Sequence, residues 1–196
     1  MAYRATATRI DRDQALRERI LDQALARVIA GGFAALTMQA LADAVGIATG
    51  SLYRHFSNKG ELAAEVFARA SQREVDALAA TLSAPGSAPQ RLAAGVQQFA
   101  ARAWYSRRLA YALIAEPVEP QVDEQRLIYR QAYAELFGDL LLEGMSAGQF
   151  ALQPPALTAA CLVGAIAEAL VGPLAPAAQS PQPDPQQLAA VSLGLS

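Results

Sequence analysis

The stretch LTMQALADAVGIATGSLYRHFSNKGEL, residues 36–62, begins with a pattern typical of a short amphipathic helix. Apolar residues recur at intervals of three and four from Met38 to Val45, which predicts a helix with one buried face. Thr37 directly precedes this helix and is expected to be its N-cap, because its hydroxyl can accept a hydrogen bond from a free amide of the first turn. Gly46 then ends the helix. This segment therefore predicts the first half of a compact helical motif.

A second, briefer helix is predicted after a turn of only a few residues. Leu52 and Phe56 lie one turn apart and mark its buried side. Two short helices joined tightly through glycine indicate a helix-turn-helix. The polar side of the second helix carries Arg54, together with His55 and Lys59, which are the only histidine and the only lysine in the chain.

The remainder of the sequence also predicts helices, so we expect an all-α fold. Strand patterns with alternating apolar residues are nearly absent. Apolar residues recur at three and four over residues 16–29, and Asn58 with Glu61 has the form of a cap that begins a long helix ending near Leu82. Further helices are expected at about residues 90–104, 106–115, 121–143, 156–172 and 185–195.

The charge is unevenly distributed along the chain and favours two domains. Residues 1–60 hold eight Lys and Arg against five Asp and Glu, whereas residues 61–196 hold eight against 13. A length of 196 residues suits one small domain joined to a larger one. We therefore expect a helix-turn-helix domain with a basic N-terminal arm at residues 1–60, and a second helical domain at residues 61–196.

The composition favours a cytoplasmic protein. One cysteine cannot form an intramolecular disulfide, and the arginine-rich N-terminus lacks the apolar stretch of a secretory signal. The longest uncharged run, residues 144–167, is split by Pro154 and Pro155, and the part that follows is shorter than the roughly 20 residues that cross a bilayer before Glu168 interrupts it. We therefore expect no membrane insertion.

One motif invites comparison with enzymes. The stretch GMSAG, residues 144–148, matches the pattern G-x-S-x-G of a hydrolase nucleophile. That motif requires a strand-to-helix turn with a histidine beside it, whereas here it ends a helical pattern and the single histidine lies in the helix-turn-helix. Phosphate-binding glycine loops and clusters with metal-ligand spacing are also absent from the sequence. We therefore expect no catalysis, no cofactor and no metal site.

The polar side of the predicted second helix has residue types that contact DNA. The major groove of B-DNA is about 12 Å wide and admits one α-helix, whose first residues reach base edges while cationic and hydroxyl groups hold phosphates. The residue types alone leave two interpretations open: a DNA-binding surface, or the solvated face of a helical adaptor that binds only protein. The candidate residues are Thr49, Ser51, Tyr53, Arg54, His55 and Lys59.

Two stretches together resemble the N-terminal DNA-binding region of the tetracycline-repressor (TetR) family. They are ILDQALARVIAGGF at residues 20–33 and the run at residues 36–62, which contains LYRHF at 52–56 and a lysine after the next cap. The resemblance covers residues 14–66. It implies a transcriptional regulator, most simply a repressor that binds a palindromic double-stranded DNA operator as a homodimer and is released by a small-molecule inducer.

The resemblance also implies roles for individual residues. Thr37 and Gln39 would lie near the DNA backbone, Ala48, Thr49 and Ser51 at the start of the recognition helix near the bases, and Tyr53, His55 and Lys59 on phosphates. The arginine-rich arm before Leu16 is compatible with a disordered tail or with a segment that lies along DNA. Among the arginines near the start of the first helix, Arg17 is the candidate for DNA contact.

Two positions depart from the family pattern. Ala48 stands where a Ser or Thr cap is frequent, and Thr49 could substitute for it. Gly60 stands in the first turn of the long helix, where an acidic residue is common, and it lowers helix propensity.

Aromatic residues gather in the second domain and suggest either core packing or a cavity. The resemblance implies an inducer pocket there for a small apolar or amphipathic molecule, with Glu116 and either Arg108 or Arg130 as a charged anchor. The aromatic candidates are Phe99, Trp104, Tyr105, Tyr111, Tyr129, Tyr133 and Phe137.

The last two predicted helices suit a partner helix. Ala160, Gly164 and Gly172 recur at multiples of four, with Glu168 in the same row, and small residues allow another helix to approach closely. Intramolecular packing explains this pattern equally well. The resemblance favours a dimer closed by a four-helix bundle, with Leu188 of the last helix as a further contact.

Overall fold

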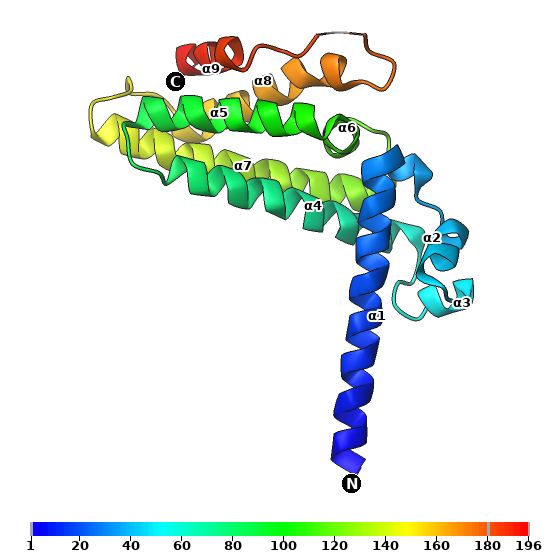
Figure 1. Cartoon of the computed structure of the whole chain (residues 1–196). Helices are drawn as coiled ribbons and strands as arrows, with labels where there is room; N and C mark the ends of the chain where they lie inside the picture. The colour runs from blue at the N-terminus through cyan, green and yellow to red at the C-terminus, as the bar shows by residue number, and fades with distance from the viewer. Residues whose placement is uncertain (1, 180, 196) are drawn as a thin grey trace.

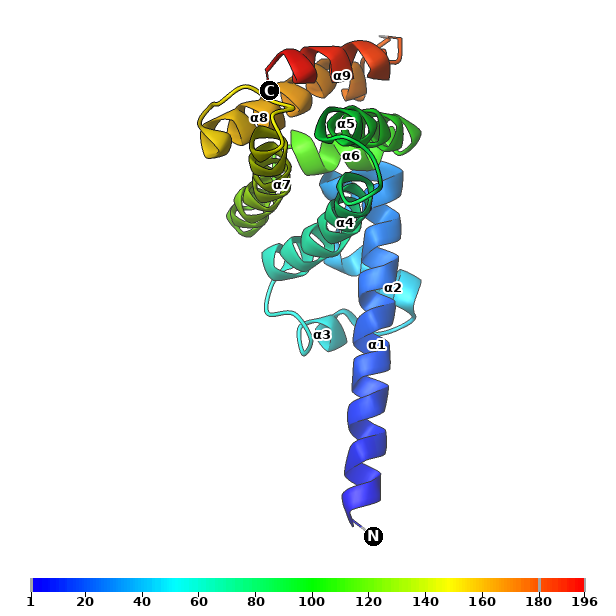
Figure 2. The ribbon, with the colours of Figure 1, turned by 90° about the vertical axis from the view of Figure 1, so that its left-hand side faces the viewer.

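The computed structural model describes residues 2–179 and 181–195, and within these residues the regular secondary structure is helical (Figure 1). The N-terminal part comprises α1 (Ala2–Gly31), the short 3₁₀ helix η1 (Phe33–Ala35), α2 (Met38–Val45) and α3 (Thr49–Leu52). The N-terminal half of α1 projects away from the rest of the molecule (Figures 1 and 2). The basic arm is therefore a continuation of α1, and the first helix begins well before the predicted residue 16.

The helix-turn-helix forms, but its second helix is shorter than the sequence predicts, because α3 ends at Leu52 and a turn separates it from Phe56. The Thr37 hydroxyl caps α2 by accepting a hydrogen bond from the amide of Ala40 at 3.3 Å. Gly46 ends α2 in the left-handed conformation, with φ of 76°, which favours glycine. Leu52 and Phe56 are both buried, and they attach α3 to the body of the domain. The predicted all-α fold with its helix-turn-helix is thus confirmed.

The larger part of the chain is a layered bundle. It comprises α4 (Lys59–Leu82), α5 (Ala88–Tyr105), α6 (Arg107–Ile114), α7 (Pro120–Ser146), α8 (Pro155–Leu174) and α9 (Pro185–Gly194). The long helices α4 and α7 pack side by side, α5 packs against α9, and α8 packs against α7. The helices α8 and α9 lie on the side of the molecule opposite the helix-turn-helix (Figures 1 and 2). Every predicted helix in this region is present, within a few residues of its expected range.

Turn and capping residues determine where these helices begin and end. The Asn58 side chain accepts a hydrogen bond from the amide of Glu61 at 2.9 Å, as expected for the start of α4. The Ser87 and Gln90 side chains form a reciprocal capping box at the start of α5. The GMSAG stretch ends α7, and Gly148 there has φ of 68°. It lies in a helix-terminating loop and not on a strand-to-helix turn.

Two hydrophobic clusters divide the core. The first joins α1, η1, α2, α3 and the first half of α4, and it also includes Ala112 from α6 and Val122 from α7. The second fills the bundle from Leu78 of α4 to Ala189 of α9. The helix-turn-helix part therefore shares its core with α6 and the start of α7. The boundary between residues 60 and 61 remains a prediction, and α4 runs across it as one continuous helix.

The helix α8 is longer than the sequence pattern suggested. It spans 20 residues with a mean hydropathy of 1.8, which makes it long and apolar enough to cross a membrane by length and composition. Pro155 is the first residue of the helix, a position that favours proline, and Glu168 does not end the helix but lies within it. Its inner side packs in the second hydrophobic cluster through Leu162, Ile166 and Leu170. Only 28% of the apolar stretch is buried, however, so most of its outer side has no contact in the chain.

Candidate DNA-binding surface and ligand cavity

The short helix α3 and the turn that follows it present a polar face to solvent because their apolar side chains are fully buried. Leu52 and Phe56 are 0% and 1% exposed, whereas Tyr53 between them is 51% exposed and Arg54 is also exposed. Ser51 and His55 are partly buried at the edges of this face. The arrangement offers a phenol hydroxyl and a guanidinium to an approaching partner.

The start of α3 is held against α2 by side-chain hydrogen bonds. The Thr49 hydroxyl donates to Gln39 Oε1 at 2.8 Å, and the Gln39 amide donates to Asp43 Oδ1 at 2.9 Å. Ala48 is the N-cap of α3 and makes no capping bond, and the expectation that Thr49 substitutes for it is wrong, because the Thr49 hydroxyl is directed to Gln39. Thr49 and Gln39 thus form one polar unit. Thr37, at the start of α2, is also exposed.

Arg17 binds within the chain. Its guanidinium donates two hydrogen bonds to the Glu65 carboxylate of α4, and it lies over the Phe56 ring with its carbon 4.8 Å from the ring centroid. The hydrogen bond from Arg17 to Glu65 raises the pKa of Arg17 above its usual value. The Arg17 guanidinium therefore ties α1 to α4 and covers Phe56, and its expected DNA contact stays a prediction.

Lys59 also has an internal partner. Its Nζ lies 2.7 Å from Glu119 Oε1, and Glu119 is the N-cap residue of α7. Burial raises the pKa of Glu119, but the hydrogen bond from Lys59 and the charge of Lys59 bring it below its usual value. Lys59 thus lies at the seam between the helix-turn-helix and the bundle, with its side chain 36% exposed.

Glu116, in the loop between α6 and α7, binds the helix-turn-helix part. Its carboxylate accepts hydrogen bonds from the amides of Phe33 at 2.9 Å and Ala34 at 3.0 Å, at the start of η1. Gly32 makes this approach possible, since its φ is 75° and a Cβ there would lie 2.5 Å from the carboxylate. This placement corrects the expectation that Glu116 anchors a ligand, because its carboxylate points at η1.

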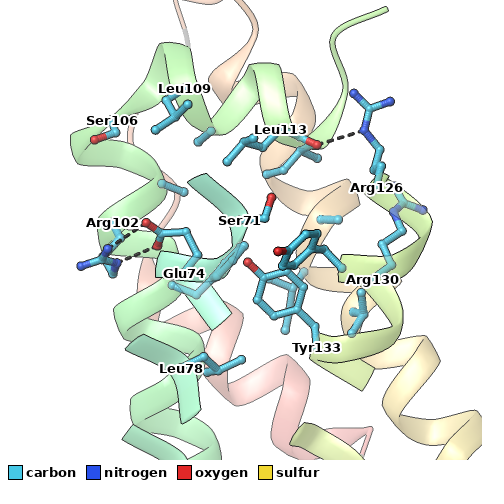
Figure 3. Close-up of a pocket in the computed structure, with 18 of the residues that line it drawn as sticks. Ser71, Glu74, Leu78, Arg102, Ser106, Leu109, Leu113, Arg126, Arg130 and Tyr133 are labelled. Carbon is cyan, nitrogen blue, oxygen red and sulfur yellow. Dashed lines mark hydrogen bonds and ion pairs between the residues drawn. The ribbon is translucent and has the colours of Figure 1, made fainter. Parts of the chain in front are cut away.

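Arg126 of α7 connects this loop to the interior of the bundle. Its guanidinium donates to the carbonyls of Leu113 at 3.0 Å and Glu116 at 2.9 Å, and it pairs with Asp123. The same side chain lines a cavity inside the bundle (Figure 3). The cavity wall and the loop that holds the helix-turn-helix therefore share one residue.

The cavity lies between α4, α5, α6, α7 and α8, and its volume is about 100 Å³. This is several times the space that one water molecule needs. Apolar side chains dominate the lining, and a few polar groups are placed among them, which is typical of small-molecule sites. The apolar lining includes Phe67, Leu78, Leu109, Leu113, Val163 and Ile166.

The structure brings four of the predicted ligand residues to this cavity, namely Phe99, Tyr129, Tyr133 and Phe137. Phe99 and Tyr133 pack edge to face, with ring centroids 5.7 Å apart, and the Tyr129 hydroxyl donates to Gln72 at 3.2 Å. Arg130, the alternative charged anchor, also lines the cavity and is exposed at its edge.

The other predicted ligand residues lie outside the cavity lining. Trp104 is covered by the Arg107 guanidinium at 4.1 Å, and Tyr111 packs in the second hydrophobic cluster. Tyr105 is 92% exposed and Arg108 is also exposed.

Sequence reasoning missed five polar residues of the cavity, two of which are Ser106 and Arg126. Ser71 and Glu74 come from α4, and Arg102 comes from α5. The Arg102 guanidinium binds the Glu74 carboxylate at 2.7 and 2.8 Å (Figure 3). Ser71 and Glu74 are three residues apart on an amphipathic helix, and this spacing could have indicated that both lie on the same face of it.

The predicted dimer residues of α8 are exposed. Ala160, Gly164 and Glu168 lie on the outer side of the helix, where a Cβ added to Gly164 would have no neighbour within 4 Å. The exposed Leu157 and Cys161 share this side. Leu188 of α9 packs instead against the second hydrophobic cluster and is only partly exposed.

A helix-turn-helix with a buried anchor and an exposed polar face, carried on a larger helical bundle with an internal cavity, defines the class of helix-turn-helix regulators. Residues 20–66 match the family described as "Bacterial regulatory proteins, tetR family". The helix-turn-helix region of this chain therefore matches this family, as its sequence resemblance implied.

Curated relatives are similar over the same region. The HTH-type transcriptional repressor KstR of Rhodococcus jostii (strain RHA1) is 42% identical over 57 residues, which are 29% of this chain and 27% of the relative. KstR of Mycobacterium tuberculosis is 39% identical over 77 residues, which are 39% of this chain and 34% of the relative. The chain therefore matches about a third or less of the length of these relatives.

Solved structures are similar over nearly the whole chain. The regulator FadR from Bacillus subtilis, in complex with stearoyl-CoA, superposes with a TM-score of 0.74 at 18% identity, covering 91% of this chain and 96% of that chain. The fatty acid degradation regulator FadR from Bacillus halodurans has the same TM-score at 20% identity, with 91% and 93% covered. At these identities the likeness concerns the fold.

Proposed function

We propose that this chain is a ligand-responsive transcriptional repressor that binds a palindromic operator as a homodimer and is released by a small molecule. The observation that carries the proposal is the two-sided segment formed by α3 and the turn after it, residues 49–56. Leu52 and Phe56 fix it to the domain, and Tyr53 and Arg54 face outward where a phosphate backbone can reach them. The KstR relatives, which are named as transcriptional repressors, support this proposal over the same residues.

The base-proximal residues are Ala48, Thr49 and Ser51 at the start of α3. Thr49 is bonded to Gln39, so the two side chains would meet the DNA as one unit. Tyr53, Arg54 and His55 would hold phosphates, while Thr37 would contact the backbone at the start of α2. Lys59 would reach a phosphate only when it leaves Glu119, which makes its contribution conditional.

The outer side of α8 is proposed as the dimer surface. An apolar helix of 20 residues with most of its surface uncovered needs a partner, and a second copy of α8 fits a row of small residues. We accordingly propose a cytoplasmic protein in which α8 meets another α8 and not a membrane. Two recognition helices about 34 Å apart would then match successive major grooves.

Ligand response is proposed to pass through the loop between α6 and α7. Glu116 holds η1, Glu119 holds the first residue of α4, and Arg126 joins the loop to the cavity. A ligand that displaces Arg126 or α6 would move both attachments together and change the spacing of the two helix-turn-helix units. The coupling free energy of such linked sites is typically about 1 to 3 kcal/mol, or roughly 5- to 150-fold in affinity.

Selection of bound fragments from random DNA tests the operator claim. We expect a palindrome whose half-sites are about one helical turn apart. A lack of enrichment for any sequence, with weak binding that salt does not affect, would favour a helical adaptor that binds only protein.

Calorimetry tests the ligand claim separately. Ligand and operator must weaken each other by the same factor, because linkage between two binding sites is reciprocal. A bound small molecule that leaves operator affinity unchanged would refute the switch and leave DNA binding intact. We propose no catalytic role for the chain.

A further inference from the structure

Two hydroxyl groups line the cavity, those of Ser71 and Tyr133. Ser71 is only 3% exposed and lines the cavity, and Tyr133 reaches its centre from α7 (Figure 3). Within residues 2–179 and 181–195, neither hydroxyl makes a hydrogen bond. Both residues line the same cavity, so a molecule inside it can supply a hydrogen-bond partner to either hydroxyl.

The charged groups around the cavity are already satisfied, with one exception at its edge. Glu74 and Arg102 neutralise each other, and Arg126 is bound to Asp123 and to three backbone carbonyls. Arg130 makes no ion pair in the described part of the chain, but it is exposed. The interior therefore offers hydrogen bonds to a ligand without offering a net charge.

We propose that the cavity binds a neutral, mainly apolar molecule whose single carbonyl or hydroxyl oxygen lies between Ser71 and Tyr133. This inference rests on the proposed function and specifies its ligand. A charged ligand head is disfavoured between these two hydroxyls, because the unpaired Arg130 is exposed at the edge of the cavity. A carboxylate buried away from a free cation carries a desolvation cost of several kcal/mol. Burial also raises the pKa of Tyr133 well above its usual value, which keeps its hydroxyl protonated as a donor.

The apolar part of the ligand is expected to contain a ring. Phe67, Phe99 and Phe137 line the cavity together with branched aliphatic side chains, and aromatic side chains favour edge-to-face and offset contacts with other rings. The edge-to-face contact with Phe99 also fixes the Tyr133 ring, so its hydroxyl position is set before a ligand arrives.

Matched probe molecules test the proposal by calorimetry on the full-length chain in the absence of DNA. The neutral ketones acetophenone and benzophenone are compared with ethylbenzene and diphenylmethane, which have similar size without the oxygen, and with benzoate, which is charged. Ser71→Ala and Tyr133→Phe each remove one hydroxyl, and Tyr105→Phe serves as a control because Tyr105 is 92% exposed and outside the cavity.

We expect at least one ketone to bind, and each cavity substitution to weaken its binding by about 3- to 10-fold, the usual value of one hydrogen bond. The hydrocarbons should be unaffected by the same substitutions or should bind more tightly, and Tyr105→Phe should change nothing. Circular dichroism on each variant confirms that the bundle is intact, and Ser71→Ala keeps the test valid if Tyr133→Phe destabilises the fold.

Three results would overturn the proposal. These are the absence of ketone binding, equal responses of ketones and hydrocarbons to both substitutions, and tighter binding of benzoate than of acetophenone. None of them depends on DNA. If the chain binds ketones through Ser71 but does not bind an operator, the proposed function is refuted and the proposed ligand class is still supported.

Discussion

Lys59 Nζ lies 2.7 Å from Glu119 Oε1, so the first residue of α4 is bound to the residue at the N-cap position of α7. Glu116, three residues earlier in the same loop, caps η1 at the other end of the helix-turn-helix part. One short loop thus holds two separate points of the domain that carries α3. A movement of this loop would be transmitted to both points at once.

Substitution of Glu116 should loosen the helix-turn-helix part. Glu116→Gln keeps the shape but replaces one carboxylate oxygen by a donor, so one of the two amides of Phe33 and Ala34 loses its acceptor. We expect the free energy of unfolding to fall by about 1 to 3 kcal/mol, measured by urea denaturation. Glu124→Gln, the same change on the exposed side of α7, is the matched control. Equal stabilities of the two variants would argue against the capping role.

The ion pair between Lys59 and Glu119 should make stability depend on pH in the acid range. The pKa of Glu119 is lowered in the folded chain, so its contribution is present above the unfolded value of about 4.5 and is lost as pH falls through the folded value. Both side chains are about one-third exposed, so the effect should be about 1 kcal/mol or less.

Wild type should therefore lose more stability than Glu119→Gln between about pH 5 and pH 3, as measured by chemical denaturation at each pH. A stability difference that stays constant across this range would show that the carboxylate does not titrate against Lys59.

The outer side of α8 should control the oligomeric state. Leu157 is 63% exposed there, and Leu157→Glu places a charge on the proposed dimer surface. We expect the dimer dissociation constant, measured by analytical ultracentrifugation, to increase at least about tenfold, since an unpaired charge buried in an interface costs more than 1.4 kcal/mol. Leu127→Glu is the control, because Leu127 is 69% exposed on α7. An unchanged dimer in both variants would place the interface elsewhere.

The helices and the anchor of α3 were predictable because their causes are local. Glycine and proline mark the ends of helices, and the spacing of Leu52 and Phe56 identifies the buried side directly. The cap at Asn58 formed as its sequence suggests, for the same reason.

The contacts that join the two parts of the molecule were not predictable, because their partners are distant in the sequence. Glu116 binds amides 83 and 82 residues away, and Arg17 binds a carboxylate 48 residues away. An acidic residue in a loop or an arginine on a helix has no local feature that names such a partner. Ser71 likewise sits in an ordinary amphipathic pattern, and only the packing of five helices shows that its hydroxyl faces a cavity.

The central claim is that the exposed side of α3 contacts DNA phosphates, and fluorescence anisotropy against salt concentration tests it most directly. For the full chain and a duplex carrying its selected operator, the logarithm of the affinity should fall linearly with the logarithm of the salt concentration. Arg54→Ala should weaken binding and reduce this slope by about 1. Arg108→Ala changes another exposed arginine, on α6, and should alter neither affinity nor slope. Affinity that is independent of salt, or equal slopes for wild type and Arg54→Ala, would contradict the account.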